Sequence, residues 1–432
     1  MKSVQRYYRE LYRRVLRTVD VPADLEAITD VDADAEVTPR RAGLTRVQVD
    51  AIWDATQGLY RSGAHPLLSL CLRKRGEIVL NRSIGYSRDD RVATVDTPVC
   101  LFSASKAVTA VLIHLLAEQG EVDLLNPVSH YIPAFAARGK GSITLLQLLT
   151  HRGGVPTVPE GIDPDLLYDH EAALDLICDA EPVDHQGRIQ AYHAITSGFI
   201  FNELIRVTTG RNAQQFLDKY ISKPMGMRYF RFGLTQRDQS RAATNVTTGL
   251  DSALVNQALA GVLGAHPDTA VEMSNDPNFY DAIIPSANLY ATAEEVSRFY
   301  QMLLNHGEWQ GQQILDPLTV HRATRSLGGS VLDRSLMMPM RYSAGFMLGG
   351  SPIGIYGKSS EYAYGHVGFA NIVCWADPTR DIAVSIMNTG KLVFGSHLLS
   401  LPMLLATITN ECEPCVDMAG DVPVYCRPEK AG

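Results

Sequence analysis

The sequence predicts an α+β protein, in which an antiparallel sheet is flanked by helices and carries an inserted, mostly helical lobe. Two strand-like runs near the N-terminus, Leu67 to Leu72 and Glu77 to Tyr86, surround the turn-forming pair Arg75-Gly76. A second strand pair is expected within Phe369 to Met387, and the glycine motif, Gly365 to Phe369, is expected on the first strand of this hairpin. Residues 127–285 show helical patterns and few strand runs. We therefore expect both strand pairs to join one sheet that the helical segment interrupts.

Helices are expected to cover the faces of this sheet. Apolar residues recur at helical spacing in three segments, Arg46 to Arg61, Ser103 to Glu118 and about Phe394 to Thr409, and Pro402 should kink the last of them. The predicted sheet domain is discontinuous, the lobe lies between its halves, and a tail follows. The expected boundaries are 37–126 with 286–410 for the sheet domain, 127–285 for the lobe and 411–432 for the tail. The active site is expected in the cleft between the lobes, and the loop-rich segment Asn256 to Phe279 is expected to be a variable insertion near the mouth of this cleft.

Residues 1–36 are predicted to form an amphipathic helix and an acidic linker. Arginines interrupt the apolar residues of the first 19 positions, so a signal peptide is not expected. The helix either packs on its own chain or attaches to an anionic membrane surface or a partner subunit, which includes a second copy of the chain. Asp20 to Glu36 is acidic and poor in apolar residues, which is typical of a linker. Apolar runs fall far short of the roughly 18–20 residues of a transmembrane helix, and we expect a cytoplasmic protein.

Composition excludes several classes of function. The chain has 432 residues, of which 46% are hydrophobic and 20% charged, and its net charge is −8. It contains no basic patch interleaved with aromatic residues, so nucleic acid is not an expected partner. Cys412 and Cys415, with Cys426, offer the only metal-like spacing, but no histidine beyond His397 supplies a fourth ligand. We expect neither a metal nor a cofactor.

One motif points to chemistry. Ser103-Ala104-Ser105-Lys106 is the only Ser-x-x-Lys in the chain. It follows the strand-like run Val99 to Phe102, and a helix that begins at the motif places Ser103 and Lys106 on one face, one turn apart. Ser105 is the rival nucleophile, but it lacks this relation to the lysine. The chain has nine lysines against 30 arginines, and a desolvated lysine, unlike arginine, can become a neutral base.

Further segments complete a family pattern. They are Tyr192-His193-Ala194, the strand-like His366-Val367-Gly368-Phe369, Ile143 to Gly154, Pro224-Met225-Gly226-Met227 and Phe232-Gly233-Leu234. With the Ser-x-x-Lys motif, they resemble the serine β-lactamase and penicillin-binding-protein-like hydrolases of the class C β-lactamase type, and most closely the family VIII esterases. The resemblance covers about residues 44–410. It implies a β-lactamase/transpeptidase-like fold.

The resemblance also implies the roles of the site residues. Ser103 attacks the carbonyl and becomes acylated, and Lys106 and Tyr192 share the proton transfers. A phenol normally titrates near 10, and we expect a Lys106 ammonium to favour the Tyr192 phenolate. The backbone N–H groups of Ser103 and Phe369 form the oxyanion hole. The residues implied to contact the substrate are His366, Gly368 and Ala194. His366 could instead donate to a backbone carbonyl and shape the strand edge, and we expect His193 and His151 to be structural.

Two departures from the family pattern concern the substrate. Ala194 stands where lactam-cleaving members carry Asn, and His366 stands where they carry Lys. The amide that grips an acyl-side amide and the permanent cation that binds a carboxylate are thus both absent. We therefore expect a serine hydrolase that cleaves small-molecule carboxylic esters through an acyl-enzyme. The alternatives are a D-amino-acid peptidase, a weak β-lactamase, an acyltransferase, or a scaffold without activity, against which the intact motifs argue.

Overall fold

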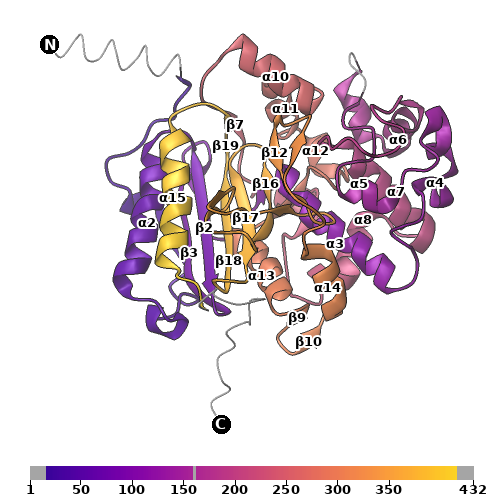
Figure 1. Cartoon of the computed structure of the whole chain (residues 1–432). Coiled ribbons are helices and arrows are strands. Elements are labelled where there is room, and N and C mark those ends of the chain that lie inside the picture. Colours follow the sequence, from indigo (N-terminus) through magenta and orange to yellow (C-terminus); the bar gives the residue numbers. More distant parts are fainter. Residues whose placement is uncertain (1–15, 159–161, 416–432) are drawn as a thin grey trace.

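The computed structural model describes residues 16–158 and 162–415. The expected N-terminal helix and most of the expected tail, including Cys426, fall outside these residues. An eight-stranded antiparallel sheet lies at the centre of the described part, in the order β1-β3-β2-β18-β17-β16-β13, with β4 paired to β3 (Figure 1). Its strands are β1 (Thr29–Val31), β2 (Leu67–Lys74), β3 (Glu77–Arg88), β4 (Arg91–Val92), β13 (Met347–Leu348), β16 (Tyr364–Gly368), β17 (Ile372–Asp377) and β18 (Ile382–Asn388).

The sheet joins the two halves of the chain as predicted. β2 and β3 form the N-terminal hairpin, and β18 pairs with β2 in antiparallel register, with Ser385 opposite Cys71. The C-terminal prediction was wrong in one respect. The glycine motif does not lie in the first strand of the β17–β18 hairpin but in a strand of its own, β16, which pairs with β17 through the tight turn after Gly368. Two consecutive hairpins therefore form a three-stranded meander.

Part of the predicted acidic linker is an edge strand. Thr29–Val31 pairs with β3, and two acidic residues that follow it bond to side chains of β3. The Asn81 side chain donates to Asp32 over 2.9 Å, and Arg82 forms an ion pair with Glu36 at 2.7 Å. The acidic composition therefore reflects bonds to one strand rather than an unstructured connection.

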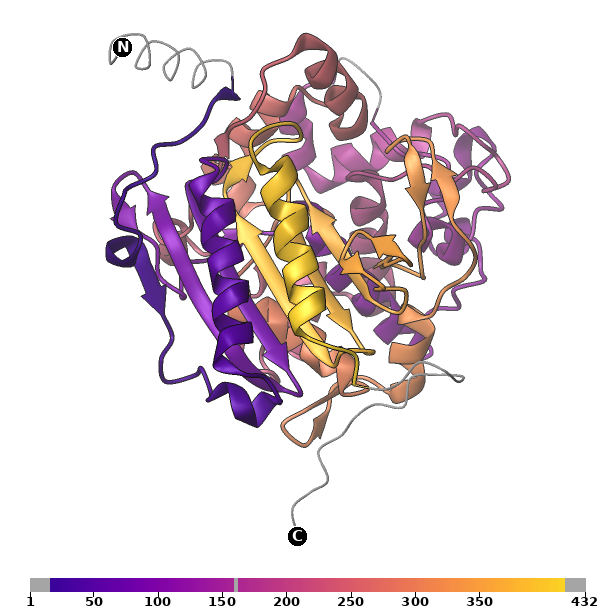
Figure 2. The same ribbon diagram turned by 60° about the vertical axis from the view of Figure 1, so that its left-hand side comes forward.

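Helices cover both faces of the sheet. α2 (Arg46–Arg61) and α15 (His397–Glu411, with Pro402 inside it) lie side by side across one face, and α13 (Ala293–Leu304) packs on the other (Figure 2). β2, β17 and β18 are consequently buried along their whole lengths, as strands covered on both sides are. These positions confirm the predicted α+β architecture.

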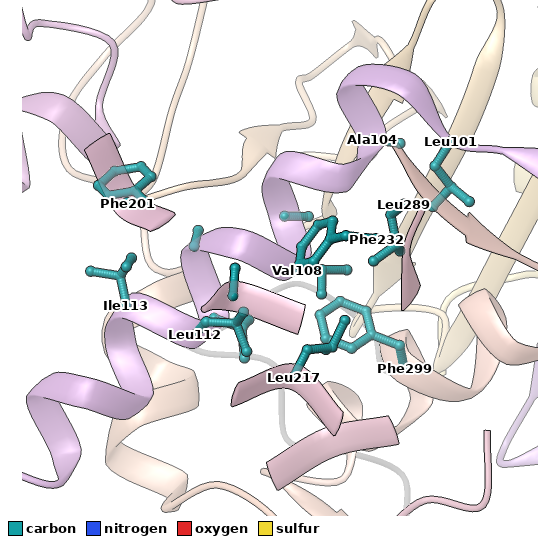
Figure 3. Packing of buried hydrophobic residues seen from close by; sticks show 14 of the residues in the cluster. Leu101, Ala104, Val108, Leu112, Ile113, Phe201, Leu217, Phe232, Leu289 and Phe299 are labelled. Atoms are coloured by element: carbon teal, nitrogen blue, oxygen red, sulfur yellow. The ribbon is translucent and has the colours of Figure 1, made fainter. Parts of the chain in front are cut away.

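α3 (Ser105–Glu118) passes through the larger hydrophobic core. All of its residues from Ser105 to Leu116 are buried, so this helix has no solvent face. Val108 and Leu112 face Phe232 and Phe299 (Figure 3). The helix that carries Lys106 is therefore held rigidly by packing on every side.

The remaining described elements belong to the helical region and to small sheets. The helices are α4 (Val128–Tyr131), α5 (Leu145–Leu149), α6 (His170–Asp179), α7 (Thr196–Thr209), α8 (Ala213–Leu217), α9 (Gln236–Gln239), α10 (Ala253–Leu263), α11 (Pro267–Met273), α12 (Pro277–Asp281) and α14 (Pro317–Thr324). The short strands are β5 (Val99–Cys100), β6 (Arg231–Phe232), β7 (Val246–Thr247), β8 (Leu289–Ala291), β9 (Glu308–Trp309), β10 (Gln312–Gln313), β11 (Val331–Asp333), β12 (Met338–Met340), β14 (Ile353–Gly354), β15 (Gly357–Lys358) and β19 (Gly390–Lys391).

The helical region has the predicted place in the fold. α4 to α8 lie beside the sheet, at the right of Figure 1. The boundaries of this lobe at residues 127 and 285 stay a prediction. Among the described residues, none of the helices combines the length and the apolar character that crossing a membrane requires.

Candidate active site

Ser103 lies in a tight turn between a strand and a buried helix. The turn is a 3-10 helix, Phe102–Ala104, that leads from β5 into α3, so the α-helix begins two residues later than predicted. Phe102 adopts a φ of 47°, a left-handed conformation that costs a residue with a side chain about 1–3 kcal/mol. Such strain is typical of functional sites, and here it immediately precedes the predicted nucleophile.

Lys106 meets Ser103 as the motif predicts. The Nζ–Oγ distance is 3.2 Å. Nζ also donates to two backbone carbonyls, those of Ala194 and, at 3.0 Å, Ser286. A neutral amine has two N–H groups and one lone pair, so these carbonyls satisfy both N–H groups and direct the lone pair toward the Ser103 hydroxyl. Lys106 is thus placed to accept the hydroxyl proton.

The environment of Lys106 favours its neutral form. Its side chain is buried, and none of its three hydrogen-bond partners carries a charge. Burial lowers the pKa of Lys106 well below the ordinary value of 10.5. The amine can therefore become a neutral base at a lower pH than an exposed lysine can.

Tyr192 lies on the segment that precedes α7. Its ring centroid is 4.9 Å from Lys106 Nζ, and its buried hydroxyl lies beside the Ser103 hydroxyl. Burial raises the pKa of Tyr192 well above 10, and the nearby Ser103 hydroxyl opposes this shift only in part. The sequence argument relied on a lysine ammonium to favour the phenolate, whereas burial favours a neutral amine beside a neutral phenol.

The end of β16 packs against the turn that carries Ser103. The Phe369 and Phe102 rings meet edge to face at 5.7 Å between centroids. A Cβ atom at Gly368 would lie 2.3 Å from the Leu101 carbonyl oxygen, so only glycine permits this approach. The backbones of Ser103 and Phe369, which the family resemblance pairs as oxyanion donors, are thereby brought together.

The two remaining predicted substrate contacts, Ala194 and His366, have different surroundings in the structure. Ala194 lines a hollow beside Ser103. His366 is only 1% exposed, and its Nδ1 lies 2.8 Å from the Val367 carbonyl oxygen. Burial, with Lys106 nearby, lowers the pKa of His366 to about 3, so the ring is neutral at pH 7 rather than partly charged. These contacts favour the alternative in which His366 shapes the strand edge, and its contact with substrate stays a prediction.

Sequence reasoning missed the groups that hold Tyr192. The Asp333 carboxylate, fully buried in β11, accepts a hydrogen bond from the Tyr192 backbone N–H at 3.0 Å and another from the Tyr342 hydroxyl at 3.1 Å. The His151 ring packs against both tyrosine rings, with centroids 4.7 Å away in each case. His193 is buried, as expected of a structural residue, and its backbone N–H donates to His151 Nδ1. Only the fold brings Asp333 to Tyr192, because 141 positions separate them.

Two further groups near the motif were also missed. The Ser286 carbonyl, which accepts from Lys106, is fixed by the Ser286 hydroxyl, which donates to the Ile195 carbonyl at 2.8 Å. Lys391 is a second buried lysine, and its Nζ lies 4.7 Å from the Phe102 ring centroid. Burial lowers the pKa of Lys391 to about 7. The scarcity of lysine in this chain is the signal that pointed to Lys106 and would have pointed to Lys391.

A small apolar hollow of about 90 Å³ opens beside Ser103. Its lining combines the end of β16 with residues of the helical region, which is consistent with the predicted cleft. The sequence placed a loop-rich insertion at Asn256 to Phe279 near the mouth of this cleft. The segment instead forms α10, α11 and the start of α12, and its residues line the hollow. Within the described residues, no group of three or more His, Cys, Asp or Glu side chains could hold a metal ion.

Ser105 has a structural position, and a prediction follows. Its hydroxyl is fully buried, donates to the Phe102 carbonyl and accepts from the Leu289 N–H at 3.0 Å. We expect Ser105→Ala to lower the free energy of unfolding by about 1–3 kcal/mol, because it leaves a buried N–H without a partner, while most activity remains. Urea unfolding and ester kinetics measure the two effects, and the exposed Ser326→Ala is the control, with a change below about 0.5 kcal/mol. An inactive but stable Ser105→Ala protein would contradict the assignment.

Comparisons with known proteins agree with this geometry. The family model described as Beta-lactamase matches residues 49–395. The chain belongs to the beta-lactamase family. With this membership, the protein is a hydrolase, and its α+β, β-lactamase/transpeptidase-like fold is confirmed.

Relatives within the beta-lactamase family include esterases. The chain is 29% identical over 311 residues to the "Esterase/beta-lactamase LipL" of Mycobacterium tuberculosis, an alignment that covers 69% of this chain and 71% of that protein. A family VIII carboxylesterase structure has a TM-score of 0.74 at 24% identity and covers 86% of this chain and 99% of its own. A penicillin-binding protein homologue from Caulobacter crescentus gives 0.73 at 24% identity, with 85% and 99% covered. The two structures establish the fold alone.

Proposed function

We propose that the protein is a serine carboxylesterase that cleaves small-molecule esters through an acyl-enzyme on Ser103, with Lys106 and Tyr192 as its acid–base pair. The observation that carries this proposal is the buried Lys106 amine, whose two carbonyl partners leave its lone pair for the Ser103 hydroxyl 3.2 Å away. The esterase in the printed name of the Mycobacterium tuberculosis relative supports the same class of reaction.

The acylation step follows from these positions. The Ser103 oxygen bonds to the ester carbonyl carbon while its proton passes to Lys106 Nζ. The carbonyl oxygen becomes an oxyanion, which the Ser103 and Phe369 N–H groups bind. Removing one such donor typically costs about 2.7–4 kcal/mol of barrier. The Tyr192 phenol, protonated because it is buried, donates its proton to the departing alkoxide and regains one from the Lys106 ammonium.

Deacylation reverses these roles. A water molecule takes the place of the alcohol and loses a proton to the neutral Lys106 or, through Tyr192, to the same amine. Its oxygen attacks the acyl carbon, and the Ser103 oxygen leaves with a proton from the acid–base pair. Ser103 is then free, and the products are a carboxylic acid and an alcohol. An alcohol in place of water gives the acyltransferase alternative by the same steps.

Intact-mass spectrometry tests the proposal. The protein is mixed with p-nitrophenyl butyrate, with a fluorophosphonate and with a cephalosporin, and each adduct is mapped by peptide sequencing. We expect a butyryl or phosphonyl group on Ser103 and release of butyrate on standing. Labelling at another residue, or no adduct and no turnover with any ester, would reject the proposal.

Ester cleavage should exceed β-lactam cleavage by about a hundredfold or more in kcat/KM. Ala194 offers a lactam substituent no amide, and burial lowers the pKa of His366 to about 3, so it offers no cation for a carboxylate. One missing hydrogen bond and one missing charged contact cost a few kcal/mol together. Kinetics with p-nitrophenyl butyrate and a chromogenic cephalosporin measure the ratio. Ala194→Asn should lower it, and similar efficiencies on both substrates would contradict the prediction.

A further inference from the structure

The apolar hollow beside Ser103 is built almost entirely from hydrocarbon. Apart from the Ser103 hydroxyl, every side chain that lines it is apolar. Its far wall comes from the segment that forms α10, α11 and α12, which contributes Leu263, Ala270, Met273 and Phe279. α10 carries no charged residue, and none of its residues is buried. A charged group that entered this space would lose its hydration without gaining a partner, so only an uncharged, apolar group fits.

The position of the proton donors decides which end of an ester occupies the hollow. The leaving alcohol must lie within hydrogen-bond reach of the group that protonates it. Neither Lys106 nor Tyr192 lines the hollow. Tyr192 instead packs in a buried cluster with Met340, Tyr342 and Met347, which meets the hollow only at Ala194. The alcohol therefore leaves on the Tyr192 side, and the acyl group extends into the hollow.

We infer that the hollow is the acyl-binding site, and that the wall formed by α10 to α12 makes the protein selective for esters of uncharged, apolar carboxylic acids. This inference rests on the proposed esterase function and deepens it by naming the acid half of the substrate. Val262 packs against the Tyr192 cluster while the next residue, Leu263, lines the hollow. The end of α10 thus lies between the hollow and the Tyr192 cluster.

The first test is a series of p-nitrophenyl esters that share one leaving group. Each methylene buried in the hollow should raise kcat/KM about fourfold, so butyrate should exceed acetate by about fifteenfold. The gain should end once the chain fills the space. The p-nitrophenyl monoester of succinic acid, which carries a carboxylate on a chain of butyrate length, should react at least a hundredfold more slowly than butyrate. Equal rates along the series, or a rapid succinate ester, would overturn the inference.

The second test changes the wall of the hollow. Ala270→Phe fills it and should reduce the butyrate-to-acetate ratio from about fifteen to near one while acetate hydrolysis continues. Met273→Ala enlarges it and should extend the gain to longer chains. The matched control is Ala258→Phe, at an exposed position of α10 that does not line the hollow, and its ratio should stay at the wild-type value.

A parallel series of ethyl, butyl and hexyl acetates varies only the alcohol. Ala270→Phe should leave the ratios of kcat/KM among these three acetates at their wild-type values. If the substitution acts on the alcohol series instead of the acyl series, the hollow holds the alcohol and the inference is wrong. If the protein forms an acyl-enzyme on Ser103 but kcat/KM does not change with acyl chain length, this inference is wrong and the esterase proposal stands. A protein that hydrolyses no ester rejects both.

Discussion

Ser103→Ala should lower kcat/KM for p-nitrophenyl butyrate by about ten-thousandfold or more and leave the fold intact. The proposed reaction forms its covalent intermediate on this oxygen, and no other hydroxyl in the described part of the chain has the same relation to the Lys106 lone pair. The turn around Ser103 is held by backbone contacts and by the Phe102–Phe369 ring pair, none of which needs the Ser103 hydroxyl. Steady-state kinetics and thermal unfolding on the same preparation measure both effects.

The control for this prediction is two positions away. Ser105→Ala removes a hydroxyl from the same segment, and we expect it to cost stability rather than activity. The two variants should therefore show opposite patterns. Turnover by Ser103→Ala at near wild-type rates, or an acyl adduct mapped to Ser105, would overturn the assignment of the nucleophile.

Lys106→Arg should be nearly as damaging as Lys106→Met, with losses of about a hundred- to ten-thousandfold in kcat. Methionine keeps the length of the side chain without the amine, and arginine keeps the charge, but a guanidinium cannot act as a base in a protein. A buried guanidinium also lacks a counterion here, because the partners of Lys106 are a hydroxyl and two carbonyls. If arginine restores near wild-type rates, the lysine acts only through its charge and the proton must pass to Tyr192.

The pH dependence of wild-type activity is a second test of whether Lys106 acts as a base. Burial lowers the pKa of Lys106, so the amine is neutral above that lowered value and protonated below it. Activity should therefore fall as the pH falls through the lowered pKa of Lys106, and the residual activity of Lys106→Met should lack this acidic limb.

Lys140 offers a matched control for the lysine substitutions. It is also buried, and its Nζ donates to the carbonyls of Ala137, Cys178 and Ala180, but no serine lies among these partners. Lys140→Met should lower the free energy of unfolding without changing kcat of the folded protein. An equal loss of kcat in Lys140→Met would show that the effect at Lys106 is structural.

The sequence by itself determined most of the fold and the reacting centre. The hairpin of β2 and β3 and the helix Arg46–Arg61 follow from local patterns, because alternation and helical spacing record which face of each element is buried. The Ser103–Lys106 pair is equally local, since one helical turn brings the two side chains together.

Only the tertiary structure decided the environment of these groups. The Ser286 and Ala194 carbonyls that orient the Lys106 lone pair lie 180 and 88 positions away, and Asp333 reaches Tyr192 across 141. Burial, which favours the uncharged forms of Lys106, Tyr192 and His366, also arises only when distant elements pack around them. Residue types indicate which groups can react, but a pKa and a direction of attack depend on neighbours that the order of the chain does not reveal.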